Sequence, residues 1–237
     1  PDAPMRGILI HSVMEEFIKG IKLDSTLLNS IHLMKVARDV LGRDVPWPAT
    51  RALWLAKLSR VADWFVSKET ERQARSTPIA FEKQAKGTMT LPKLGFTLTG
   101  YADRIDETGP NRVAIFDYKT GAPPSPMQQA KFDKQLLIEA AMMEQGSFKH
   151  VGVNTVDEAV FIGLGSNPVE VRAPLLKEPP AKVLEELNQL IRAYLSDEQG
   201  FTSQRTIQSE RERGDYDHLA RFGEWDGTDI PMPEDLT

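Results

Sequence analysis

The sequence of 237 residues contains no cysteine. This absence excludes disulfide bonds, zinc–thiolate sites, iron–sulfur clusters and cysteine nucleophiles. Long hydrophobic runs are absent as well, since no stretch approaches the roughly 18 apolar residues that a membrane span needs. The first residues also lack the basic region and apolar run of a secretory signal. We therefore expect a cytoplasmic protein with no iron–sulfur cluster and no membrane association.

Positive charge is scarce relative to negative charge. The chain has 29 Lys and Arg against 34 Asp and Glu, which gives a net charge of −5. Phosphate binding needs Lys and Arg, so this balance disfavours a free-standing nucleic-acid binder. It does not exclude a nuclease, because metal ligands are acidic and a partner can supply a basic channel. If DNA is bound, we expect these local basic residues to line its path: Lys83, Lys86, Lys93, Arg104, Lys131 and Lys134.

Apolar residues at a helical spacing dominate the first third of the chain. Over the whole chain they make up 41% of the residues, which is enough to build a core. Their recurrence close to every 3.6 residues predicts helices over 7–21 and 27–41. Pro46 and Pro48 then break the pattern. A long third helix is predicted over about 50–75.

The middle of the chain is rich in β-branched and aromatic residues. This composition predicts three consecutive strands over 79–91, 96–105 and 112–118, the first two joined by a turn at 92–95. After a proline-rich loop, the patterns predict a helix, a strand, a further short strand and a last helix: 125–145, 158–164, 169–172 and 181–195. The order predicts an α/β fold, with a central mixed β-sheet flanked by helices and an N-terminal helical section.

The chain is expected to form one large domain with an extension. Its length suits a domain over 1–199, with a core at about 79–164. Residues 200–237 include few large apolar side chains and many charges, so we expect them to pack over the surface. Because the chain begins with Pro1 and not with Met, we interpret it as part of a longer protein.

The most informative residues stand at the ends of two predicted strands. Asp117 and Lys119 are two residues apart on a strand, so their side chains leave the same face. Asp103 lies near the end of the preceding strand and can meet them across the sheet. Two carboxylates beside a lysine ammonium suit a Mg²⁺ ion that activates water for phosphodiester hydrolysis. The lysine can orient that water or stabilise the transition state.

Alone, an Asp-x-Lys pair is a weak signal, because most such pairs are solvated surface features. Here the apolar segment 113–116 precedes the pair and the turn Thr120-Gly121 follows it. An apolar strand that ends in charged residues places those charges at a sheet edge. The residues that precede it, Gly100-Tyr101-Ala102-Asp103-Arg104-Ile105-Asp106, add a second carboxylate at the same end. We expect Arg104 and Asp106 to form a structural pair.

These two segments resemble the core of the RecB-like nucleases in the PD-(D/E)xK superfamily. The resemblance implies a restriction-endonuclease-like fold and a Mg²⁺ ion, with Mn²⁺ as an alternative. Arg6-Gly7-x-x-x-His11 resembles the opening helix of the family, which makes His11 a metal ligand beside Asp103, Asp117 and the backbone carbonyl of Tyr118. Glu82 stands where the family often has an acidic residue. The sequence favours equally a role as a metal ligand and a place on the surface. Gln135 resembles the start of the glutamine motif and joins Asp103, Asp117 and Lys119 as a catalytic candidate.

The resemblance extends to the end of the chain. The segment Tyr216-Asp217-His218-Leu219-Ala220-Arg221, with Glu224-Trp225, is similar to the C-terminal nuclease domain of AddB, a subunit of a bacterial helicase–nuclease. Two features depart from that pattern. Glu139 stands where the glutamine motif usually continues to a tyrosine, and the four cluster cysteines of many AddB proteins are missing, so the chain resembles a cysteine-free version.

The resemblance implies a metal-dependent DNA exonuclease in double-strand-break repair and recombination. Its partners would be DNA, in single-stranded form, and an AddA-type helicase–nuclease subunit in the bacterial cytoplasm. One alternative is a non-catalytic module that binds DNA ends or acts as a scaffold. The presence of both carboxylates and the lysine disfavours it. A second alternative is a stand-alone RecB-family enzyme of CRISPR-associated or phage type, although those commonly have cluster cysteines.

Overall fold

The computed structural model describes residues 2–197, 221 and 224, and the side chain of Ala3 is not among them. The predicted extension 200–237, and with it most of the AddB-like segment, lies outside the described residues. Within the described part of the chain, no helix combines the length and the apolar character that crossing a bilayer requires.

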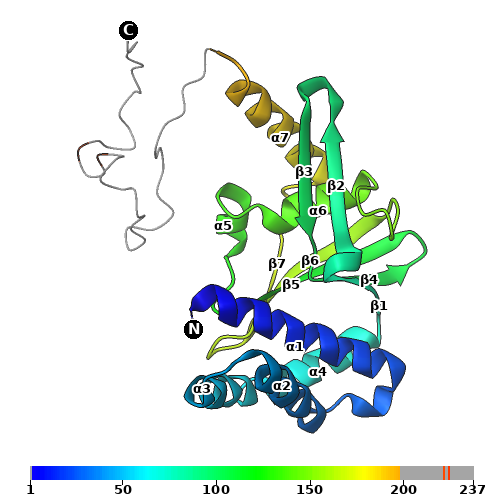
Figure 1. Ribbon diagram of the computed structural model, residues 1–237. Coiled ribbons are helices and arrows are strands. Elements are labelled where there is room, and N and C mark those ends of the chain that lie inside the picture. The colour runs from blue at the N-terminus through cyan, green and yellow to red at the C-terminus, as the bar shows by residue number, and fades with distance from the viewer. Residues whose placement is uncertain (1, 198–220, 222–223, 225–237) are drawn as a thin grey trace.

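The architecture is a mixed sheet between two layers of helices (Figure 1). The helices are α1 (Ala3–Leu23), α2 (Ser30–Asp44), α3 (Pro48–Ser59), α4 (Ala62–Gln73), α5 (Pro126–Lys131), α6 (Gln135–Glu144) and α7 (Pro180–Tyr194). The strands are β1 (Thr77–Phe81), β2 (Lys86–Leu91), β3 (Phe96–Tyr101), β4 (Arg104–Gly109), β5 (Arg112–Lys119), β6 (Thr155–Gly163) and β7 (Val169–Arg172). This arrangement confirms the predicted α/β class with a central mixed sheet.

The main sheet has the strand order β1-β4-β5-β6-β7. Only β5 and β6 run parallel in it, and the other neighbours are antiparallel. Strands β2 and β3 form a separate hairpin that projects from the sheet. Its turn at Pro92–Leu94 ends at Gly95, whose φ of +60° favours glycine because it has no Cβ. The turn predicted at 92–95 is therefore confirmed.

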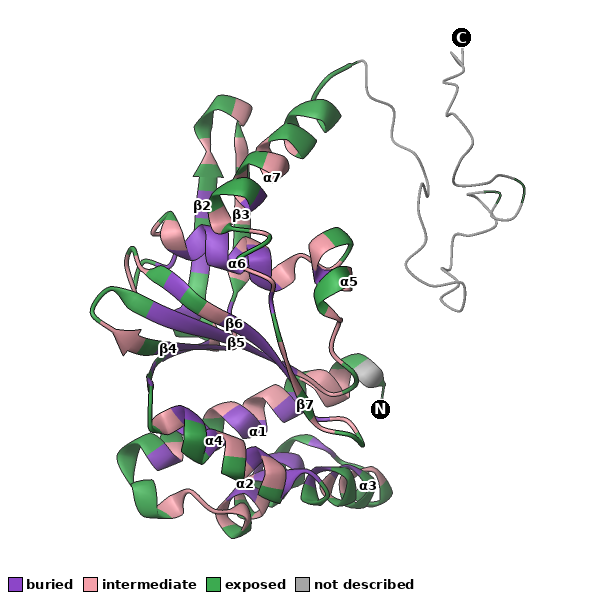
Figure 2. Ribbon diagram, turned by 180° about the vertical axis from the view of Figure 1, so that it is seen from behind, coloured by how far each residue is buried: buried purple, intermediate pink, exposed green. Residues whose placement is uncertain are grey.

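The two faces of β5 contribute to two different cores, and Figure 2 shows them as buried layers on either side of the sheet. Ala114, Phe116 and Tyr118 pack with α1, α2, α3 and α4. Val113 and Ile115 pack with α6. Because side chains alternate along a strand, Asp117 and Lys119 leave β5 on the α6 side. The backbone of Tyr118 lies between them.

Two predicted helices are each divided in the structure. The helix predicted over 50–75 is α3 followed by α4, with a break at Arg60 and Val61. The helix predicted over 125–145 is α5 followed by α6, with a break after Lys131. The first prediction was wrong because the buried residues continue at helical spacing across the break, so periodicity does not reveal it: Trp54, Leu58, Val61 and Phe65.

Two predicted strands are divided as well. The strand predicted over 79–91 is β1 and β2, joined by a short 3₁₀ turn that begins at Glu82, where φ is +38°. The strand predicted over 96–105 is β3 and β4, interrupted at Ala102 and Asp103. The backbone amide of Glu82 donates to the carbonyl of Asp103 at 3.3 Å. The two interruptions therefore coincide, and they place Glu82 and Asp103 together where the hairpin leaves the sheet.

A buried ionic network connects the sheet to α4. The guanidinium of Arg104 is fully buried and donates to Asp106 at 2.6 Å and to Glu69 at 2.8 Å. The structural pair of Arg104 and Asp106 is thus confirmed. The expectation that Arg104 lines a DNA path was wrong, because its side chain is buried. Burial raises the pKa of Glu69, but the charge and hydrogen bonds of Arg104 outweigh burial and hold it below its usual value. The stability from this pairing is lost as pH falls through that lowered pKa.

We expect Arg104→Met to lower the free energy of unfolding by about 3–5 kcal/mol, because it leaves two buried carboxylates without their shared cation. Urea denaturation at neutral pH measures the change. Arg112→Met is the matched control, since Arg112 pairs with Asp157 at the surface and such pairs contribute less than about 1 kcal/mol. Equal losses in the two variants would contradict a dominant role for the buried network.

Candidate active site

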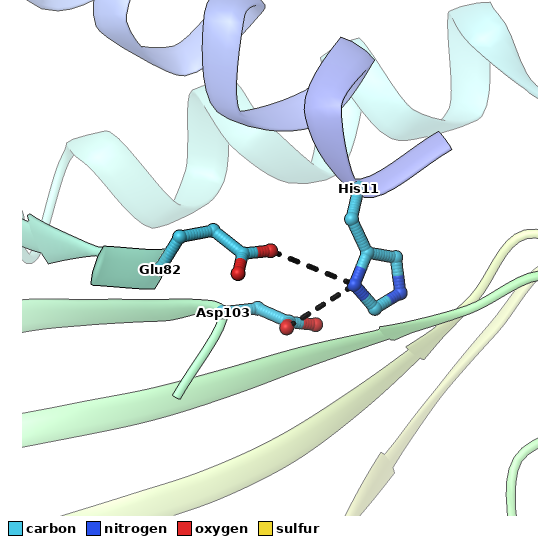
Figure 3. A group of neighbouring side chains, drawn as sticks. All are labelled: His11, Glu82 and Asp103. Carbon is cyan, nitrogen blue, oxygen red and sulfur yellow. Dashed lines mark ion pairs between the residues drawn. The ribbon is translucent and has the colours of Figure 1, made fainter. Parts of the chain in front are cut away.

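One group of polar side chains lies between α1 and the sheet, and Figure 3 shows its three members. Nδ1 of His11 lies 3.2 Å from Oδ1 of Asp103 and 3.8 Å from Oε1 of Glu82. Ligand atoms of these three residues lie within 4.8 Å of one another. They border an open cavity of about 680 Å³, large enough to admit a phosphate group. We call these three residues the α1-side cluster.

The backbone of Tyr118 completes this cluster. Its carbonyl oxygen lies 2.6 Å from Nε2 of His11, and its amide donates to Oδ2 of Asp103 at 2.7 Å. Both contacts come from the single residue between Asp117 and Lys119. The strand β5 therefore fixes His11 and Asp103 through its main chain.

The imidazole of His11 is positively charged in this arrangement. Burial alone lowers the pKa of His11, but hydrogen bonds to Asp103 and Glu82 and the charge of Asp103 outweigh burial and raise it to about 10. With both ring nitrogens protonated, Nε2 donates to the Tyr118 carbonyl and Nδ1 faces the carboxylates. A proton thus supplies the positive charge that these oxygen atoms attract.

A second group lies on the α6 side of β5 and forms a closed set of contacts. Nζ of Lys119 lies 2.8 Å from Oδ2 of Asp117 and donates to Oε1 of Gln135 at 2.9 Å. Nε2 of Gln135 donates to Oδ1 of Asp117 at 2.6 Å. Asp117 is almost fully buried, while the Lys119 side chain is 32% exposed. We call these three residues the α6-side cluster.

Glu139 joins the α6-side cluster from one helical turn beyond Gln135. Its Oε1 accepts from Nε2 of Gln135 at 3.1 Å. Burial, with the charges of Asp117 and Asp103, raises the pKa of Glu139 to about 8 despite the hydrogen bond from Gln135. Burial and the charge of Asp103 likewise raise the pKa of Asp117 to about 6, although Lys119 opposes this. Glu139 therefore carries a proton at neutral pH.

The structure brings every predicted site residue to one end of β5, but in two groups. Glu82, left evenly balanced by the sequence, lies in the α1-side cluster, whereas the oxygens of Asp117 face Lys119 and Gln135. In the sequence Glu139 stands out only as a departure from a motif, and its contact with Gln135 was not predicted. The signal was its spacing of four from Gln135, which places both side chains on one helical face.

The α1-side cluster fits a hard divalent cation. It offers carboxylate oxygens from Asp103 and Glu82, the carbonyl oxygen of Tyr118 and an imidazole nitrogen, a donor set suited to Mg²⁺ or Mn²⁺. A ligating imidazole is neutral, so a metal bound through Nδ1 of His11 would displace the proton there. Residues that could hold the metal are therefore His11, Asp103, Glu82 and Tyr118, with Asp117 adjacent along the chain.

Comparison with known proteins agrees with this geometry. The family model described as PD-(D/E)XK nuclease superfamily matches residues 1–211. The chain belongs to this superfamily. Its sheet flanked by helices is accordingly a restriction-endonuclease-like fold, and nucleases of the PD-(D/E)XK superfamily use divalent metals.

Three relatives come from the genus Rickettsia, and each is called an uncharacterized protein. The chain is 27% identical to one from Rickettsia felis over 69% of the chain, 27% identical to one from Rickettsia bellii over 60%, and 28% identical to one from Rickettsia conorii over 60%. The matched segment makes up 20%, 17% and 18% of those proteins, respectively. The chain thus spans about a fifth of their length.

We expect Mg²⁺ or Mn²⁺ to stabilise the protein against heat, because a cation bound only by the folded state adds about 2.7 kcal/mol at one hundred times its Kd. Thermal unfolding with increasing metal, against EDTA, measures the shift. Asp103→Asn should abolish it, because the amide removes a charge while it can still accept from Tyr118. Glu107→Gln, an exposed carboxylate on β4, should retain the full shift. A shift that persists in Asp103→Asn would place the ion elsewhere.

Glu139→Gln should make stability less dependent on pH. In the unfolded chain this carboxyl loses its proton near 4.5, but in the folded protein it holds the proton to about 8. Folding stability therefore falls as pH rises between these values, by on the order of a few kcal/mol. Urea denaturation at pH 5 and pH 8 should show a smaller difference for Glu139→Gln than for the wild type. Glu107→Gln serves as the exposed control, and an unchanged difference in Glu139→Gln would disprove the buried proton.

Proposed function

We propose that the chain is a metal-dependent DNA nuclease that hydrolyses phosphodiester bonds as an exonuclease. The observation that carries this proposal is the position of Lys119. Its ammonium is held by Asp117 and Gln135, and the preceding residue, Tyr118, contacts His11 and Asp103 through its backbone. A partly exposed cation next to clustered carboxylates can meet a phosphate and an attacking water together. Superfamily membership supports the same chemistry.

In this proposal the residues of the chain divide the work of hydrolysis. Lys119 orients the attacking water and stabilises negative charge on the phosphate. Gln135 accepts a hydrogen bond from the Lys119 ammonium and donates one to the Asp117 carboxylate. It thereby fixes both groups. His11, Asp103 and Glu82, with the Tyr118 carbonyl, would hold Mg²⁺ or Mn²⁺. When bound, the metal supplies Lewis-acid polarisation of the phosphodiester. Water adds to phosphorus, the bond to one ester oxygen breaks, and that oxygen leaves with a proton.

We further propose that this nuclease acts within a larger helicase–nuclease of the AddAB type, on single-stranded DNA, in double-strand-break repair in the bacterial cytoplasm. The resemblance of residues 216–221 and 224–225 to AddB motivates this proposal. The relatives are about five times longer than the segment that matches this chain, as a multidomain protein would be. An AddA-type partner would supply the basic channel that a chain of net charge −5 lacks.

We expect the protein to degrade labelled single-stranded DNA with Mg²⁺ and to be inactive in EDTA. Asp117→Asn and Lys119→Gln should each lower the rate by about 100-fold or more, because charge stabilisation and proton transfer contribute at least that much. Product ladders from DNA labelled at either end reveal the direction of digestion.

Lys149→Gln, at an exposed position between α6 and β6, is the matched control for Lys119→Gln and should retain the wild-type rate. Thermal unfolding verifies that each variant is folded. Equal cleavage by the wild type, Asp117→Asn and Lys119→Gln would place the activity elsewhere. DNA binding with no cleavage under any metal would favour the non-catalytic alternative.

A further inference from the structure

A second cavity, of about 390 Å³, opens at the N-terminal end of α1, where Figure 1 shows α3 beside it. Its walls come from α1, from α3 and from the loops that follow β5 and β6. Thr120 and Gly121 in its lining come directly after Lys119, and Ile10 directly precedes His11. This cavity, which we call the Arg6 pocket, therefore begins where the candidate active site ends.

The lining of the Arg6 pocket is strongly basic. It includes Arg6, Lys57 and Arg60, and none of its described lining residues is acidic. None of these three cations forms an ion pair with another described residue. In a chain of net charge −5, three unpaired cations around one cavity indicate an anionic ligand.

Arg6 also has an unsatisfied donor. Its Nη2 donates to Oγ1 of Thr120 at 3.3 Å, which directs the guanidinium toward the loop after β5. Its Nε is buried and has no hydrogen-bond partner in the part of the chain that the structure describes. A buried donor without an acceptor costs about 1–3 kcal/mol. An anionic oxygen bound in the pocket would remove this cost.

Four apolar residues of the lining are nearly fully buried: Ile10, Trp54, Leu58 and Leu164. A cavity lined by both cations and apolar side chains complements a nucleotide, which has a phosphate and a flat base. Its volume lies in the range for small-ligand sites. A base inside a duplex is paired and stacked, so only a single strand can place a base there without unpairing.

We propose that the Arg6 pocket binds one nucleotide of single-stranded DNA next to the bond that is cleaved. This inference rests on the proposed function and deepens it by naming a DNA contact outside the catalytic residues. Thr120 lies two residues beyond Tyr118, which corresponds to about 7 Å along an extended chain. The nucleotide in the pocket would thus lie close to the nucleotide whose phosphate is cleaved at the α1-side cluster.

The test measures binding without cleavage. A short fluorescent oligothymidylate is titrated with protein in EDTA at two salt concentrations. Lys57→Glu/Arg60→Glu should weaken binding at least about tenfold and lower the salt slope by about 1.4, since each phosphate contact to a single strand contributes about 0.7. Lys35→Glu/Arg38→Glu makes the same charge change on exposed positions of α2 and should weaken binding far less.

The variant Gly121→Leu distinguishes the shape of the pocket from the charge of its lining as the cause of binding. Gly121 lines the pocket, and a Cβ there meets no described atom within 4 Å, so leucine adds bulk to the lining without a clash at Cβ while the three cations remain. We expect this variant also to lose binding, with an unchanged melting temperature. Weakening in the charge-reversal variant but not in Gly121→Leu would overturn the pocket and leave only surface electrostatics.

Competition identifies the ligand, with thymidine monophosphate and inorganic phosphate as probes. Stronger displacement of the oligonucleotide by thymidine monophosphate than by inorganic phosphate supports a nucleotide site. Equal displacement would overturn it in favour of a simple anion site. Because binding is measured without metal, a wild type that binds through the pocket but never cleaves would defeat only the proposed function. Normal cleavage with no effect of the pocket variants would defeat only this inference.

Discussion

The strand β5 is the constraint on which the rest of the site depends. Its alternation sends Asp117 and Lys119 toward α6, while the backbone of the residue between them contacts His11 and Asp103 on the other side. A strand can contact both groups only if it is buried on both faces. The two faces of β5 pack in two different cores, and β4 and β6 flank the strand within the sheet. The helices on each face thus do more than cover the core, because α1 supplies His11 and α6 supplies Gln135.

Charge compensation explains the two groups of polar residues. On the α1 side the carboxylates raise the pKa of His11 until the imidazole itself is a cation. On the α6 side Asp117 is balanced by Lys119, and Glu139 is neutralised by its own proton. A separate network of Glu69, Arg104 and Asp106 stabilises the sheet below the site. The carboxylates of the two clusters and of the network are thus compensated in three ways: by an imidazolium, by Lys or Arg, and by a bound proton.

The negative net charge disfavours DNA binding, but the charge is not uniform over the molecule. Six of the 34 acidic residues lie in the site or in the buried network, where protons and cations compensate them. Arg104, expected near DNA, lies in that network, and Lys134 pairs with Glu186. Unpaired cations gather instead around Arg6, a residue that the sequence analysis used only as part of a motif.

The sequence alone determined the fold class, the hairpin turn and the common face of Asp117 and Lys119, because alternation and turn chemistry are local and survive in any folded context. It also paired Arg104 with Asp106 correctly, since both leave one face of a strand. It did not reveal the breaks at Arg60 and between β3 and β4, because propensity continues across them. Only the tertiary structure decided these, along with the burial of Glu139 and the meeting of Glu82 with Asp103. Each depends on residues far apart in the chain, whose packing no local pattern encodes.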